Sequence, residues 1–147
     1  MKTAIIYYSK HHSNTKKLLD AIAAGSEVKL IDVTVEPDID LSSFDCIGIA
    51  SGIYYSSFAK QILTYASESL PEGKDVFFIY THGAPKGEFL KSIREITEAK
   101  NCKEIGAYGC RGFDTFGPFK LIGGIAKGHP TVEEIKGAAE FYQKLTI

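Results

Sequence analysis

The chain has 147 residues, of which 44% are hydrophobic and 24% are charged, and its formal net charge is −1. These values are typical of one soluble globular domain, and so small a charge provides no long-range attraction to nucleic acid or an anionic membrane. No apolar run approaches the roughly 20 residues that a membrane-spanning helix needs, and the chain start lacks a signal-peptide pattern. The three cysteines lack metal-ligand spacing. We therefore expect one cytoplasmic domain over residues 1–147, with reduced thiols and no metal, nucleic-acid or membrane partner.

Apolar strand patterns and amphipathic helix patterns alternate along the chain. Strands are expected at residues 3–8, 27–33, 45–51, 74–81 and 102–110, and helices at residues 16–24, 58–69, 86–100 and 132 onward. Thr131 and Glu134 form a predicted capping box for the last helix, which should bury Val132, Ile135, Ala138, Ala139 and Tyr142. This alternation predicts an α/β fold with a doubly wound five-stranded parallel sheet in the order 2-1-3-4-5 and helices on both faces.

In a sheet of this order, a ligand binds beyond the carboxyl ends of the strands, near the switch point between the first and third strands. That rule selects the loops at residues 9–15, 51–57 and 81–87. The composition of all three loops suits a ligand site, so we treat them as one candidate site.

The first loop passes directly from a strand into a helix, so unpaired N–H groups and the positive end of the helix dipole face the turn. It carries hydroxyl and amide groups and no acidic residue. We interpret it as a phosphate-binding loop, with the candidate residues Ser9, His11, His12, Ser13, Asn14 and Thr15. The alternative is ordinary helix capping, for which Ser, Asn and Thr are also preferred.

The other two loops are suited to a flat aromatic ligand. The candidate contacts in the second loop are Ser51, Gly52, Ile53, Tyr54 and Tyr55, because tyrosines can form an aromatic wall and glycine lets the backbone come close. The third loop would form the opposite wall with Thr81, His82 and Gly83, and His82 could act as an acid near the ring. The alternative is that one tyrosine only packs on the next helix and His82 makes only a local hydrogen bond.

Three segments of the sequence together resemble the flavodoxin family. They are Tyr7–Thr15, Leu41–Ser51 and Gly73–Val76 ahead of an apolar strand, and the resemblance covers residues 1 to about 110 and the final helix. It implies a flavodoxin-like fold and noncovalent FMN, with the phosphate on the first loop and the isoalloxazine ring between the other two. The chain departs from the family pattern in its longer first loop, with Ser13 where glycine is typical, in its lack of tryptophan and in its near-neutral charge.

A Gly- and Phe-rich stretch at residues 111–130 follows the fifth predicted strand. A connection of this length in a compact domain is usually functional or disordered. The apolar rings of Phe113, Phe116 and Phe119 argue against disorder, so the stretch either covers the ligand, shapes a partner surface, or packs on the sheet edge as an Ω-like loop. Arg111 and Lys120 are the candidates for binding an anionic group there. Cys110 is either redox-active or a packed thiol.

Three functions follow from these expectations. The favoured one is an FMN-binding electron carrier with protein redox partners and no catalytic side chain, because one domain holds three ligand loops and no GxGxxG fingerprint. The alternative is an NAD(P)H-dependent flavin or quinone oxidoreductase on the same fold, which the long loop and the near-neutral charge favour. A flavin-free binding module is the third. We expect a monomer or a weak homodimer.

Overall fold

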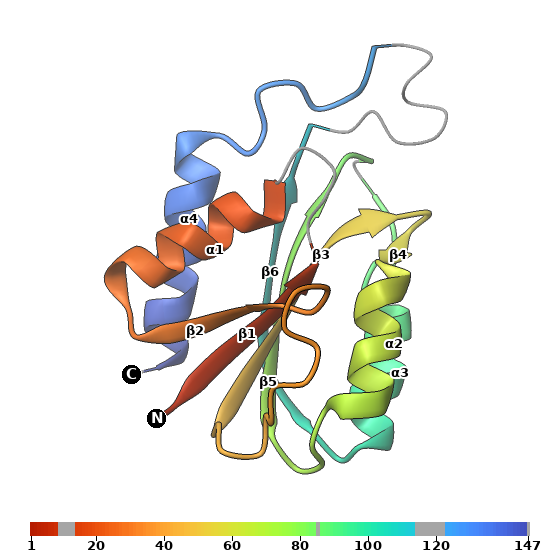
Figure 1. Cartoon of the computed structure of the whole chain (residues 1–147). Coiled ribbons are helices and arrows are strands. Elements are labelled where there is room, and N and C mark those ends of the chain that lie inside the picture. Colours follow the sequence, from red (N-terminus) through yellow and green to blue (C-terminus); the bar gives the residue numbers. More distant parts are fainter. Residues whose placement is uncertain (9–13, 85, 114–122, 147) are drawn as a thin grey trace.

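The centre of the computed structural model, which describes residues 1–8, 14–84, 86–113 and 123–146, is a parallel sheet (Figure 1). Its strands are β1 (Thr3–Tyr8), β2 (Val28–Asp32), β3 (Cys46–Tyr54), β5 (Asp75–His82) and β6 (Lys103–Arg111), in the order β2-β1-β3-β5-β6. The short strand β4 (Ser57–Phe58) pairs only with β3, in antiparallel fashion. Without β4, the order is the predicted 2-1-3-4-5, and the doubly wound fold is confirmed.

Two pairs of helices cover the two faces of the sheet (Figure 1). Helices α1 (Asn14–Gly25) and α4 (Val132–Leu145) cover one face, and α2 (Lys60–Ser69) and α3 (Lys91–Ala99) cover the other. Because successive side chains of a strand point to opposite faces, adjacent phenylalanines of β5 serve different cores. Phe77 packs with α1 and α4, and Phe78 packs with α2 and α3. Central strands buried on both sides are therefore nearly all apolar, as predicted.

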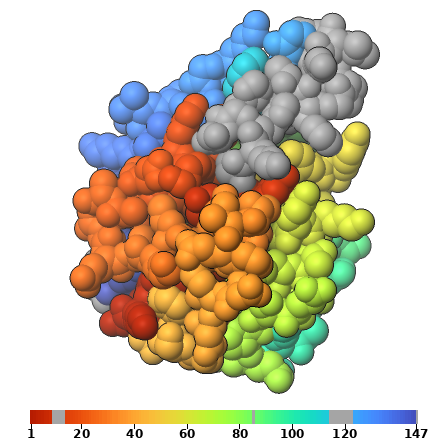
Figure 2. All heavy atoms as spheres, viewed as in Figure 1, coloured from red at the N-terminus to blue at the C-terminus, as the bar shows by residue number. Residues whose placement is uncertain are grey.

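The connection from residue 33 to residue 45 is part of the second core. Val33, Leu41 and Phe44 are buried together with residues of α2 and α3. Figure 2 shows the atoms of this segment side by side with those of α2. A polar connection thus anchors itself through three apolar side chains. No helix in the described part of the chain is both long and apolar enough to cross a membrane.

Three local expectations were wrong. Helix α3 begins at Lys91 instead of residue 86, because Phe89 and Leu90 are already buried in the turn before it. Phe58 belongs to β4, where it pairs with Ile53, instead of opening α2. Val132, the first residue of α4, is 80% exposed. Tertiary packing thus overrode the local apolar period at Phe58 and at the start of α3, whereas Val132 does not pack on the core.

The capping box of α4 is confirmed. The hydroxyl of Thr131 accepts a hydrogen bond from the backbone N–H of Glu134 at 3.1 Å, and the Glu134 carboxylate accepts one from the backbone N–H of Thr131 at 2.7 Å. Two helix-end donors are thereby satisfied at once. This fixes where the chain enters α4 after the long loop.

The hairpin between β3 and β4 has a strained tip. Tyr54 pairs with Ser57, and the two residues between them have positive φ angles, 48° at Tyr55 and 63° at Ser56. Such a two-residue turn is of type I′ and favours Asn and Gly, because a side chain in the left-handed region costs about 1–2 kcal/mol. Tyr55 is 79% exposed at this tip. The chain thus tolerates strain at a loop of the predicted ligand site.

We predict that Ser56→Gly raises the free energy of unfolding by about 1 kcal/mol, because glycine adopts a positive φ without steric cost. The matched control Ser56→Ala keeps the side-chain clash and should change stability by no more than a few tenths of a kcal/mol, as an ordinary surface substitution does. Urea denaturation of the three proteins measures both effects. A gain from Ser56→Ala as large as that from Ser56→Gly would contradict this view of the turn.

Candidate functional site

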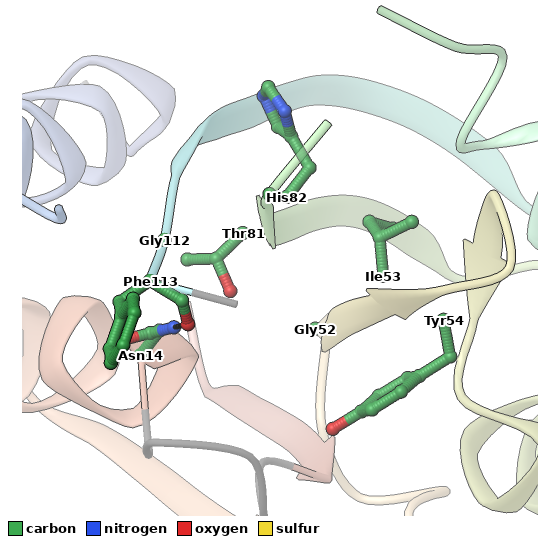
Figure 3. Close-up of a pocket in the computed structure, with 9 residues that line it drawn as sticks. Asn14, Gly52, Ile53, Tyr54, Thr81, His82, Gly112 and Phe113 are labelled. Carbon is green, nitrogen blue, oxygen red and sulfur yellow. Dashed lines mark hydrogen bonds between the residues drawn. The ribbon is translucent and has the colours of Figure 1, made fainter. Parts of the chain in front are cut away.

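A cavity lies at the carboxyl edge of the sheet, between the start of α1, the ends of β3 and β5, and the residues that follow β6 (Figure 3). In the close-up, Asn14 and Phe113 lie on one side of it, and Ile53 and Tyr54 lie on the other. The described residues enclose about 20 Å³, which holds about one water molecule. It is lined by Asn14, Gly52, Ile53, Tyr54, Thr81, His82, Gly83, Gly112 and Phe113. The switch-point rule therefore located the cavity correctly.

Asn14 presents an unpaired acceptor at this cavity. Its side chain is 6% exposed, and its amide N–H donates to the carbonyl oxygen of Phe113 at 2.8 Å. Its other amide atom, Oδ1, is buried and has no donor in the described part of the chain. Gly112 lies close beside it, since a Cβ at Gly112 would be only 2.7 Å from Asn14 Nδ2. A buried acceptor without a donor costs about 1–3 kcal/mol, so Asn14 is set up to receive a hydrogen bond from a ligand.

Thr15 and Thr81 join the first loop to the third. Their hydroxyl oxygens are 2.8 Å apart, and both residues are buried. The bond connects the start of α1 to the end of β5. The hydroxyl of Thr15 is thus committed to the protein, so its role is to position the helix start behind the cavity.

The hydroxyl group of Ser51 fixes the start of the second loop by two hydrogen bonds. This residue is fully buried, and its hydroxyl accepts a hydrogen bond from Ala59 N at 2.9 Å and donates to the Gly52 carbonyl oxygen. The Tyr54 ring lies over Gly52, where a Cβ would be 3.5 Å from it, and meets the Tyr8 ring edge-on with centroids 6.4 Å apart. Tyr54 therefore forms an aromatic wall of the cavity beside Gly52.

His82 is held in one orientation and one tautomer. Its Nδ1 lies 2.6 Å from the carbonyl oxygen of Ala84, and because a carbonyl only accepts, Nδ1 carries the proton. Its ring stacks on Phe89 with centroids 4.9 Å apart, and its carbonyl oxygen accepts from Gly112 N at 3.0 Å. The ring is thus fixed by the turn after β5 and by Phe89, whereas the His82 backbone joins β5 to the segment after β6.

The structure brings together seven of the predicted site residues: Asn14, Gly52, Ile53, Tyr54, Thr81, His82 and Gly83. Thr15 and Ser51 are buried behind the cavity, and Tyr55 stands exposed at the hairpin tip. Ser9, His11, His12 and Ser13 lie outside the described residues.

Gly112 and Phe113 were not predicted as ligand contacts, although they line the cavity. The available signal was their position directly after a strand that ends at the same edge as β5. Phe113 N donates to the carbonyl oxygen of His129 at 2.9 Å, so the two described ends of the long loop meet. Lys120 lies outside the described residues.

Cys110 is a packed thiol. It is buried in the core under α1 and α4, and this burial raises its pKa to about 12. The same cause raises the pKa of Cys46 to about 11. At neutral pH neither group forms the thiolate that redox chemistry requires. Of the two readings of Cys110, the structure supports the packed one.

The chain resembles proteins of one family in sequence and in fold. A family model described as a flavodoxin domain matches residues 5–107. An uncharacterized protein of Methanocaldococcus jannaschii is 36% identical over 148 residues, which cover 99% of this chain and 98% of that protein. Among solved structures, flavodoxin 2 from Bacillus cereus has a TM-score of 0.69 at 15% identity, covering 99% of this chain and 98% of that one. A Fusobacterium nucleatum flavodoxin bound to flavin mononucleotide has a TM-score of 0.63 at 14% identity, covering 98% of each chain.

We predict that Thr15→Val and Thr81→Val each lower the free energy of unfolding by about 1–2 kcal/mol, because each leaves one buried hydroxyl without a partner. The double variant should lose less than the sum, with a coupling of about 1 kcal/mol. Urea denaturation measures this cycle. The control cycle pairs Thr15→Val with Thr97→Val, whose hydroxyl bonds within α3, and should be additive. Additivity in the first cycle would show that the Thr15–Thr81 bond does not stabilise the fold.

We predict that Cys102 is the first thiol to react with a disulfide reagent at about pH 8, because it is partly exposed and the other two are buried. With a pKa of about 12, only about one Cys110 side chain in 10,000 is a thiolate at that pH. Native Cys102→Ser protein should therefore show almost no fast labelling, whereas in denaturant it should release two equivalents. Fast labelling of native Cys102→Ser protein at Cys110 would contradict the packed assignment.

Proposed function

This chain belongs to the flavodoxin domain family, and on that premise we propose that it binds FMN noncovalently and transfers electrons through it. The observation that carries the proposal is the buried Oδ1 of Asn14, an acceptor that finds no donor in the described part of the chain and lines the switch-point cavity. A hydroxyl-bearing ligand satisfies such an atom. The ribityl chain of FMN is a ligand of this kind.

The residues around the cavity have the chemistry that FMN needs. Helix α1 begins at Asn14 with no acidic residue in its first turn, so its N-terminus attracts a phosphate on the preceding loop. Tyr54 takes the place of the absent tryptophan as the aromatic contact of the ring. Because the cavity holds only about 20 Å³, binding requires the Tyr54 side chain to rotate away from Gly52.

Bound FMN supplies the electron chemistry, in steps of one or two electrons. The protein excludes water from the ring through Ile53, Tyr54 and Phe113. No side chain needs to form a covalent bond in this scheme. We therefore propose an electron carrier that works with separate redox proteins.

A second candidate is an NAD(P)H-dependent flavin or quinone oxidoreductase. The observation in its favour is that Gly112 and Phe113, the start of the long loop, line the cavity together with the three ligand loops. A segment added at this place can shape a binding site for a small molecule. The net charge of −1 also provides little of the acidic field that guides a carrier to basic partners.

A visible absorption spectrum of the purified protein with FMN tests the proposal, followed by titration with dithionite and then with NAD(P)H. Binding of one FMN per chain and reduction in separate one-electron stages support the carrier. Rapid reduction by NAD(P)H alone, with turnover on a quinone, supports the oxidoreductase. A protein that takes up no FMN would overturn both.

We predict that Gly112→Ala weakens FMN binding about tenfold, because its Cβ would displace the Asn14 amide and a lost hydrogen bond of about 1.4 kcal/mol corresponds to tenfold in Kd. Gly25→Ala is the matched control, since its nearest neighbour would be Gln143 Nε2 at 3.8 Å, and it should bind FMN as the parent does. Quenching of flavin fluorescence measures both affinities. Equal affinities of the two variants would remove Asn14 from the site.

A further inference from the structure

Arg111 occupies a defined place beside the cavity. It is the last residue of β6 and pairs in register with His82, whose carbonyl oxygen accepts a hydrogen bond from Gly112 N. Paired residues of a parallel sheet point to the same face. Thr81 and its partner Cys110 face α1 and α4. His82 and Arg111 therefore face the opposite side, toward Phe89 and α3.

The Nε atom of the Arg111 guanidinium has no acceptor in the described part of the chain. This atom is buried, and the side chain as a whole is half-buried. The chain has only two arginines. The other one, Arg94, has hydrogen-bond acceptors within the protein. Arg94 donates from two nitrogens to the two carboxylate oxygens of Glu104, at 2.8 and 2.9 Å. A buried donor of a charged group destabilises a protein when it has no acceptor. The Nε atom of Arg111 is therefore suited to donating a hydrogen bond to a ligand.

Space for a ligand exists on the same face. Ala107 and Gly109 share this face of β6 with Arg111, and the Tyr80 ring rests against Gly109. A hollow of about 690 Å³ lies between β6 and α3 on this face. Its lining combines Tyr80, Phe89 and Ala107 with charged side chains of both signs from α3 and the turn before it, namely Glu88, Lys91, Arg94, Glu95 and Glu98. Arg111 lies on the same face of β6 as this hollow, two residues beyond Gly109, although it is not one of the residues that line it.

We propose that Arg111 binds an oxyanion, the carboxylate or phosphate of the small molecule that exchanges electrons at the neighbouring cavity. The role in electron exchange rests on the proposed function, whereas the binding of the anion does not. A guanidinium fork matches two oxygens of either group. The phosphate of FMN itself is not the ligand, because Arg111 faces the α3 side of the sheet, whereas α1, whose N-terminus would attract that phosphate, covers the other face.

Nitrogen-15 NMR of the arginine Nε–H groups tests the proposal directly, because the spectrum contains only two such signals. Arg111→Lys and Arg94→Lys assign them. On titration of the parent protein with inorganic pyrophosphate or with citrate, the Arg111 signal should shift saturably, and the Arg94 signal should stay in place because its fork is already occupied. Saturation by pyrophosphate alone identifies a phosphate ligand, and saturation by citrate alone identifies a carboxylate. An Arg111 signal that responds to neither probe, or no more than it does to sodium chloride, overturns the proposal.

Two variants separate this subsite from the FMN site. Arg111→Gln should lower the affinity for the effective anion at least tenfold by calorimetry and leave FMN affinity within about twofold, since each tenfold corresponds to about 1.4 kcal/mol. Arg111→Lys should recover part of the anion affinity, because it keeps the charge without the fork. A tenfold loss of FMN affinity in Arg111→Gln would assign the residue to the cofactor instead and overturn the proposal. If the parent binds no FMN, the proposed function fails, while the response of the Arg111 signal still decides the anion subsite.

Discussion

The site depends on one constraint, the parallel register of β1, β3, β5 and β6. Tyr8 pairs with Ser51, Gly52 pairs with Thr81, and His82 pairs with Arg111, so four strand ends stop at one edge of the sheet. Because parallel strands need crossover helices, the same register also forces a helix start or a loop to follow each strand end there. The cavity is a consequence of where the strands stop, and the side chains of the loops determine only what it can hold.

The register also divides the edge into two chemically different faces. On the α1 face, Thr81 bonds to Thr15 and Cys110 is sealed in the core, so polar groups are satisfied and the thiol stays protonated. On the α3 face, the His82 ring stacks on Phe89, and Arg111 Nε has no acceptor in the described part of the chain. Adjacent residues of a strand alternate between faces. The ends of β5 and β6 therefore present satisfied polar groups on the α1 face and the unpaired Nε of Arg111 on the α3 face.

Sequence reasoning predicted the strand order, both helical layers and seven cavity residues, because these depend on apolar periods and on the switch-point rule. It did not predict β4. Pairing of Ile53 with Phe58 requires a turn with positive φ angles at Tyr55 and Ser56, and tyrosine and serine rarely adopt such angles. It also missed Gly112, because nothing local marks a glycine that must make room for the Asn14 amide, which is far away along the chain. Contacts between distant loops carry no periodic signal.

Carrier and enzyme differ physically in what must reach the ring. A carrier needs only an exposed edge of its cofactor, since electrons cross a short gap, whereas an oxidoreductase must hold a second small molecule against the ring in a fixed orientation. The three loops at the ends of β1, β3 and β5 suffice for the first task. Gly112, Phe113 and the half-buried charge of Arg111 are additional to these loops, and a cation that binds an anionic small molecule would serve the second task. The residues at the end of β6 therefore distinguish the two functions. An anion bound there would favour the oxidoreductase over the electron carrier.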